Sequence, residues 1–165
     1  MIFTDVLAGL TDAGVRFVVI GGVAAGVQGA TRATFDLNIC YDPEPRNIEK
    51  LARTLASWHA YLRGVEPGLP FIMDAKTFRV TPVMTLTTDH GPLDVMDNVP
   101  GVGDFAAVRA SSVAVDAGSV RFRALGLPAL VKAKRATRTA KDLEQLPELE
   151  ALLERTRRKG RARAQ

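Results

Sequence analysis

Two side chains with metal-binding oxygen atoms stand two residues apart in a short run that begins at Phe35 and reads FDLNICY. Apolar and polar residues alternate there, and a period of two residues is typical of a strand with one buried face. The buried face would carry Phe35, Leu37, Ile39 and Tyr41. Asp36 and Asn38 then share the opposite face, where carboxylate and amide oxygens suit a hard divalent cation.

A pair of glycines lies upstream of this strand, at the end of an apolar run. Residues 17–20 read FVVI and stop at Gly21-Gly22, and a segment of mostly small residues, 23–29, follows. Glycines let a backbone turn tightly and approach a ligand closely. The small residues favour a helix over 22–29, and a helix that opens after such a turn presents free N–H groups that attract phosphate.

A third acid with a similar setting is Asp94, in the run GPLDVM. Leu93 and Val95 flank it, so alternation places the Asp94 carboxylate opposite the core face of a strand. Asp89 and Asp97 are alternatives, but both are expected at strand ends or turns. A plain solvated carboxylate is the other interpretation of Asp94.

This order of strand, Gly-Gly, short helix and a strand with D-x-N resembles the nucleotidyltransferase superfamily, which has the DNA polymerase β-like fold. The lead-in Arg32-x-Thr34-x-Asp36 looks like that of small bacterial members related to abortive-infection and toxin–antitoxin nucleotidyltransferases. The resemblance implies a protein that binds an NTP with Mg²⁺, two ions being possible. It would transfer a nucleoside monophosphate to a hydroxyl of a protein, an RNA such as tRNA, or a small molecule.

The resemblance also assigns roles to residues. Asp36, Asn38 and Asp94 would be catalytic and would ligate the metal, since two-metal phosphoryl transfer needs ligands that hold two ions about 3.5–4 Å apart. The nucleotide would contact Gly21, Gly22, Arg32 and Thr34.

Asn38 departs from the superfamily pattern, in which the second position is Asp or Glu. An Asn carbonyl can ligate Mg²⁺ but brings no charge, so metal affinity should fall. Whether the chain is an enzyme therefore stays open. The alternative is a catalytically weakened nucleotide-binding or interaction module on the same fold.

A second group of polar residues lies near the C-terminus, in the segment LVKAKRATRTAKDLE. It resembles the C-terminal part of the small nucleotidyltransferases, where a helix with a lysine precedes a Lys-Asp pair. The match makes Lys134 a triphosphate contact and adds Lys141 and Asp142 to the nucleotide site. The simpler interpretation is a solvated basic helix in which Arg138 and Asp142 pair at i,i+4.

Composition bounds the class of protein. The chain has 165 residues, 47% of them hydrophobic, which suits one domain with a single core. No apolar run is long enough to cross a membrane, and the first residues lack the basic lead of a secretory signal. Cys40 is the only cysteine, so no internal disulfide can form and we expect a cytoplasmic protein.

Positive charge gathers at the C-terminal end. Residues 155–165 hold six basic residues and no acid, whereas the whole chain has a net charge of +4. The segment is expected to be a disordered, solvated tail. It could also contact nucleic acid, because basic tails bind phosphate without reading sequence. The third functional hypothesis is accordingly a basic-tailed nucleic-acid binder in which the glycine turn is only structural.

The periodicities predict an α+β (mixed α/β) nucleotidyltransferase fold: a mixed sheet of about four to six strands flanked by helices, with a helical C-terminal segment. Strands are expected at 16–20, 35–41, 83–88, 93–96, 112–115 and 120–123. Helices are expected at about 2–13, 22–29, 45–62 and 128–138, followed by one near Asp142 and one around 149–153. Residues 1–127 would form the core, 128–154 would pack on it within the same domain, and 155–165 would be the tail.

Overall fold

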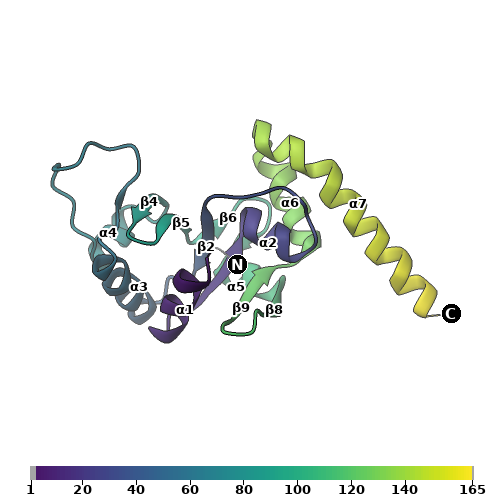
Figure 1. Ribbon diagram of the computed structural model, residues 1–165, viewed down its shortest axis with the longest axis horizontal. Coiled ribbons are helices and arrows are strands. Elements are labelled where there is room, and N and C mark those ends of the chain that lie inside the picture. Colours follow the sequence, from purple (N-terminus) through teal and green to yellow (C-terminus); the bar gives the residue numbers. More distant parts are fainter. Residues whose placement is uncertain (1–2, 165) are drawn as a thin grey trace.

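A computed structural model describes residues 3–164, and Figure 1 shows the arrangement of its elements. The N-terminal half contains α1 (Thr4–Asp12), β1 (Phe17–Ile20), α2 (Gly21–Val27), β2 (Leu37–Tyr41), α3 (Pro45–Ser57), β3 (Tyr61–Leu62) and α4 (Ala75–Val80). The C-terminal half contains β4 (Met84–Thr88), β5 (Gly91–Met96), β6 (Asn98–Val99), β7 (Gly103–Asp104), α5 (Phe105–Ala110), β8 (Ser112–Asp116), β9 (Arg121–Leu125), α6 (Leu127–Thr137) and α7 (Ala140–Arg163).

One mixed sheet organises these elements, as the alternation in the sequence predicts. Its seven strands lie in the order β3-β4-β5-β2-β1-β9-β8. The central strand pairs are mixed: β1 is antiparallel to β2 but parallel to β9, and β2 is parallel to β5. The sheet has one strand more than the largest number expected, because the two-residue strand β3 extends the edge beside β4.

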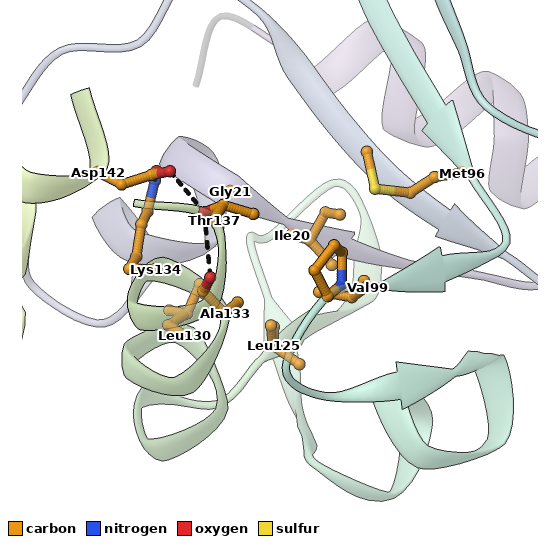
Figure 2. Close-up of a pocket in the computed structure, with 11 residues that line it drawn as sticks. Ile20, Gly21, Met96, Val99, Leu125, Leu130, Ala133, Lys134, Thr137 and Asp142 are labelled. Carbon is orange, nitrogen blue, oxygen red and sulfur yellow. Dashed lines mark hydrogen bonds and ion pairs between the residues drawn. The ribbon is translucent and has the colours of Figure 1, made fainter. Parts of the chain in front are cut away.

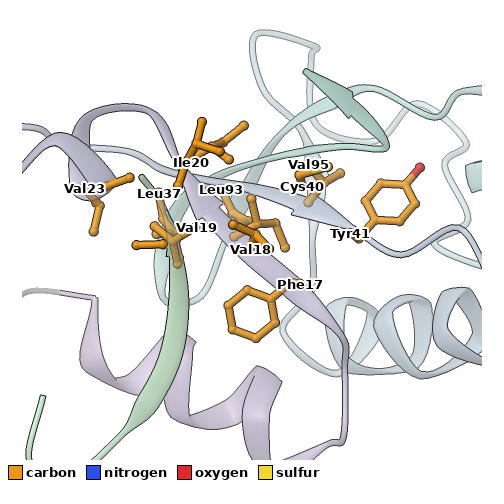
Figure 3. Packing of buried hydrophobic residues seen from close by; sticks show 14 of the residues in the cluster. Phe17, Val18, Val19, Ile20, Val23, Leu37, Cys40, Tyr41, Leu93 and Val95 are labelled. Carbon is orange, nitrogen blue, oxygen red and sulfur yellow. The ribbon is translucent and has the colours of Figure 1, made fainter. Parts of the chain in front are cut away.

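The core lies on both faces of the central strands. All four residues of β1 are buried, and on β2 the apolar side chains of Leu37 and Ile39 are fully buried. Cys40 points to the other face and is also fully buried, as expected for a small apolar side chain. Figure 3 shows this packing around β1, β2 and β5. The central strands are therefore held from both sides.

Two boundaries differ from the sequence prediction. The strand β2 begins at Leu37, and Phe35 is 81% exposed rather than part of the core face, because the chain before Leu37 bends away as a loop. The helix α3 ends at Ser57 rather than near residue 62. Soon after it, His59 adopts a left-handed conformation with φ of 50°, which turns the chain towards β3.

The short helices α4 and α5 were not predicted, because six residues are too few to show a helical period. Both begin with an aspartate cap: Asp74 accepts a hydrogen bond from the Thr77 N–H at 2.9 Å, and Asp104 accepts one from the Ala107 N–H at 3.0 Å. The small hairpin of β6 and β7 was also not predicted.

The C-terminal region contains two helices where three were expected. The helix α7 continues through Pro147 to Arg163, so the residues expected to form a disordered tail are helical as far as Arg163. Arg and Lys favour helices, and Arg158 pairs with Glu154 at i,i+4. Residue 165 of the expected tail and residue 2 of the expected first helix lie outside the described residues. Within residues 3–164, no helix is both long and apolar enough to cross a bilayer.

Candidate functional site

The strand register brings the three predicted metal ligands to one place. Asn38 on β2 lies opposite Ile20 at the end of β1 and beside Asp94 on β5. Paired residues on neighbouring strands point to the same face of a sheet. Asp36 precedes β2 and lies close enough to Asp94 to raise the pKa of that carboxyl group. The two carboxylates and the amide thus converge where β1 ends at the glycine turn.

The glycine turn fits this place because it has no room for side chains. Gly21 has a φ of 65°, which favours glycine, and a Cβ atom there would lie 3.3 Å from the Cβ of Asn38. A Cβ on Gly22 would lie 2.7 Å from Thr34 Oγ1. The two glycines therefore allow the turn to pack directly against β2 and the loop that leads into it.

Asp36 is held by its neighbours in sequence. Thr34 Oγ1 donates a hydrogen bond to Asp36 Oδ1 at 3.2 Å, and Asn38 Nδ2 donates one to Oδ2 at 3.2 Å. Lys141 Nζ lies 3.7 Å from Oδ1. Burial raises the pKa of Asp36, but these hydrogen bonds and the lysine charge outweigh it and hold the pKa below its ordinary value. Asp36 is therefore a carboxylate over the whole physiological range.

Asp94 has a different partner, Arg63, which the sequence analysis missed. Arg63 Nη2 donates to Asp94 Oδ1 at 2.7 Å and to the Leu86 carbonyl at 2.9 Å, while Arg63 Nε is buried without an acceptor among the described residues. Burial raises the pKa of Asp94 above its ordinary value; Arg63 opposes the rise and Asp36 adds to it. Two neighbouring carboxylates thus have pKa values displaced in opposite directions.

These donors fit a Mg²⁺ ion that brings other oxygen ligands with it. Among residues 3–164 there is no group of three His, Cys, Asp or Glu side chains that could hold a metal. The site instead offers two carboxylates and the amide of Asn38. Mg²⁺ is commonly bound through one or two carboxylates, with substrate phosphates and water completing its shell. Arg63 and Lys141 already balance the negative charges of Asp94 and Asp36. The protein without nucleotide would therefore bind Mg²⁺ only weakly.

Lys134 and Asp142 form a buried ion pair next to the turn (Figure 2). Lys134 Nζ lies 2.7 Å from Asp142 Oδ1, and both side chains are about nine-tenths buried. Asp142 Oδ2 also accepts hydrogen bonds from Thr137 Oγ1 and from the Thr139 N–H. Burial raises the pKa of Asp142, but the contacts with Lys134, Thr137 and Thr139 lower it far below its ordinary value. Because the pair joins α6 to the start of α7, the expected i,i+4 pairing of Arg138 with Asp142 is not formed.

Lys141 and Arg32, the other two basic residues assigned to the nucleotide, differ in how closely an acidic partner holds them. Lys141 is about half exposed, and its nearest partner is Asp36. Arg32 is bound to Glu144 on α7, and the adjacent Thr31 donates to Glu148 through both its N–H and its hydroxyl group. Lys141 can therefore contact an added ligand without losing a close partner, whereas Arg32 would have to leave Glu144.

Two cavities flank the glycine turn. One, of about 120 Å³, lies between β1, α6 and the loop after β5, and Gly21, Lys134 and Asp142 line it together with apolar side chains (Figure 2). The second, of about 380 Å³, is lined by Phe3, Gly22, Val23, Gly26, Val27, Arg32 and Thr34. The first has room for small groups only, whereas the second falls within the volume range of ligand pockets.

Comparison with known proteins bears on the fold. No family model and no curated protein matches the chain. A solved structure from Thermotoga maritima, described as that of "a putative nucleotidyltransferase", superposes with a TM-score of 0.53 at 14% identity. The match covers 95% of this chain and 91% of the other. An identity this low carries the fold and not the activity, and the chain has the nucleotidyltransferase fold that its strand, glycine turn and D-x-N motif predict.

Proposed function

We propose that this protein is a nucleotidyltransferase, which binds an NTP with Mg²⁺ and transfers its nucleoside monophosphate to a hydroxyl group. The observation that carries the proposal is the convergence of Asp36, Asn38 and Asp94 at the glycine turn. The fold supports it, because acids on adjacent strands beside such a turn are what metal-assisted phosphoryl transfer requires. The Arg32-x-Thr34 lead-in favours a relation to the small bacterial toxin-type members, and the acceptor can be a protein, an RNA or a small molecule.

In the proposed reaction the acceptor oxygen forms a bond to the α-phosphorus, and the bond from that phosphorus to the bridging oxygen breaks. Pyrophosphate leaves with the bond electrons, and the hydroxyl proton passes to a base. A bound Mg²⁺ supplies neutralisation of phosphate charge. Asp36 and Asp94 would hold the ion beside the phosphate groups, and a carboxylate oxygen of Asp94 would accept the hydroxyl proton.

The phosphate contacts follow from which basic residues are free. Lys141 is exposed and lies beside Asp36, so its ammonium group can reach a phosphate group bound next to that carboxylate. The Nζ of Lys134 is already satisfied by Asp142 and buried. We therefore assign the phosphate contact to Lys141 and a structural role to Lys134 and Asp142. Gly21 and Gly22 contribute through backbone that a ligand can approach closely.

The test is transfer of label from an α-³²P NTP, with pyrophosphate release measured in parallel. The wild-type chain should label an acceptor from a mixture of protein, RNA and small-molecule fractions, and Asp94→Asn should abolish transfer. The matched control is Asp89→Asn, an exposed acid in the β4–β5 turn, beyond the end of β5 that lies three residues or about 10 Å from Asp94. Equal loss in both variants, or full activity of Asp94→Asn, would contradict the assignment.

A second candidate function is nucleotide binding without turnover. Asn38 in place of an acid, together with Arg63 on Asp94, favours it, because the site holds as many positive as negative side chains. Mg²⁺-dependent NTP binding with no pyrophosphate release across all acceptor fractions would select this function. Titration calorimetry with a non-hydrolysable NTP measures the binding directly.

A further inference from the structure

The C-terminal third of α7 is a charged arm that leaves the body of the protein. Figure 1 shows the helix extending away from the sheet to the C-terminus. Its last apolar side chains packed against the core are Leu152 and Leu153. Every described residue from Glu154 onwards is exposed. The part of α7 from residue 155 to residue 163, called the basic arm below, therefore takes no part in the core.

The composition of the basic arm excludes most roles for an exposed helix. It reads RTRRKGRAR and holds six basic residues with no acid. A helix that lies on a membrane needs a broad apolar face, and this arm has none. Arg158 pairs with Glu154, and no other basic residue of the arm has a partner among residues 3–164. Its positive charge is thus almost entirely uncompensated.

The charges surround the helix axis instead of forming one stripe. Arg155, Lys159 and Arg163 follow each other at i,i+4 and share one face. Arg157, Arg158 and Arg161 point to the opposite side, at helical steps of about 100° per residue. An acidic protein surface would meet only one of these faces. A nucleic acid that flanks or wraps the helix presents phosphates on both sides at once.

From these observations we infer that the basic arm binds the phosphodiester backbone of a nucleic acid. The position of the arm gives the binding a consequence that rests on the proposed function. Lys141 and Arg155 stand on the same helix, about 21 Å apart at 1.5 Å per residue. A nucleic acid held by the arm is thereby tethered to the helix that carries Lys141, and the hydroxyl that accepts the nucleotide is then one of its own.

The test is fluorescence anisotropy with labelled single-stranded RNA, duplex RNA and duplex DNA at several salt concentrations. If all six charges contact duplex phosphates, log K should fall with log salt at a slope of about −5, which is about 10³-fold between 50 and 200 mM. Single strands should give about −4. Comparison of the three probes identifies which form of nucleic acid binds.

The decisive variant replaces Arg155, Lys159 and Arg163 with Gln, which keeps helix propensity and removes one charged face. Its slope on a duplex should become shallower by about 3. The matched control replaces Arg46, Lys50 and Arg53 on α3, three exposed basic residues, and should keep the wild-type slope. Circular dichroism verifies that α7 stays helical in the first variant.

Several results would overturn the inference. One is an equal change of slope in both triple variants, and another is binding that does not depend on salt. A third is that polyglutamate competes as well as RNA, which would indicate an acidic protein partner. Asp94→Asn should retain nucleic-acid binding while losing nucleotide transfer, so failure of the arm and failure of the proposed function give different patterns.

Discussion

The buried pair of Lys134 and Asp142 gives the sharpest test of how the C-terminal helices are held. If the pair is structural, Asp142→Asn leaves the Lys134 ammonium buried without a counter-charge. Breaking a buried pair from one side typically costs about 3–5 kcal/mol, a large part of the 5–15 kcal/mol that stabilises a domain of this size. The Asn side chain can still accept the Thr139 N–H bond, so we expect the lower end, about 3 kcal/mol.

The reverse change should cost less. In Lys134→Met, the Asp142 carboxylate keeps the hydrogen bonds from Thr137 and from the Thr139 N–H, so we expect a loss of about 1–3 kcal/mol. The double variant should then be less destabilised than the sum of the two, by about 2 kcal/mol. Urea denaturation of the four proteins followed by circular dichroism measures this coupling.

The pair also predicts a dependence on pH. The pKa of Asp142 is lower in the folded chain than its ordinary value of 3.8. The stabilisation is therefore fully present above about pH 5, and it is lost as the pH falls below 3.8 towards the lowered pKa of the folded chain. Asp142→Asn should remove this part of the acid limb of the stability curve. The reasoning is refuted if the double variant is additive, or if Lys134→Met abolishes NTP binding at unchanged stability, since Lys134 would then be a phosphate ligand.

Three further changes test the site itself. Gly22→Ala should destabilise the chain by about 1–3 kcal/mol because its Cβ would lie 2.7 Å from Thr34 Oγ1 and 2.8 Å from Thr34 Cβ, and Thr34→Gly, which removes both atoms, should recover part of the loss in thermal denaturation. Arg63→Gln removes the positive charge that lowers the pKa of Asp94, so NMR titration should show that pKa rise further. The same variant should bind Mn²⁺ more tightly without nucleotide, by calorimetry. Asn38→Asp should strengthen Mn²⁺ binding about tenfold by adding a ligand charge, and an unchanged affinity would place position 38 outside the metal shell.

The central strands could be predicted because short patterns of apolar and polar residues indicate which of their side chains are buried. The run before Gly21-Gly22 is wholly apolar, and the hairpin around Asp89-His90 has turn residues between two alternating runs. The same alternation placed Asp94 on the face that Asn38 shares. Phe35 was misjudged because alternation continues past the point where the chain leaves the sheet, and local sequence does not mark that end.

Arg63 could not be found by such patterns. It meets Asp94 only because β3 pairs with β4 and β4 with β5, which brings together residues 31 positions apart. The strand β3 that positions it has two residues, too few for a period. Contacts made through sheet pairing depend on the whole topology, so a single sequence does not specify them.

The burial of Lys134, in contrast, had a signal. Leu127, Leu130 and Val131 form an apolar stripe on α6, and Lys134 continues it at the next helical step. A lysine on an apolar stripe needs a buried acid, and the T-x-x-D pattern from Thr139 to Asp142 marks a helix start close by. The stripe and the helix start together indicate a pair between Lys134 and Asp142.

The single cysteine of the chain has a practical consequence. Cys40 is fully buried in the sheet, and burial raises the pKa of its thiol to about 12. Since the thiolate is the species that reacts with alkylating reagents, the folded chain behaves towards maleimides as if it had no cysteine. A new cysteine at an exposed position of α7 would then take a fluorophore alone, and the whole length of the helix becomes accessible to distance measurements without removing a native side chain.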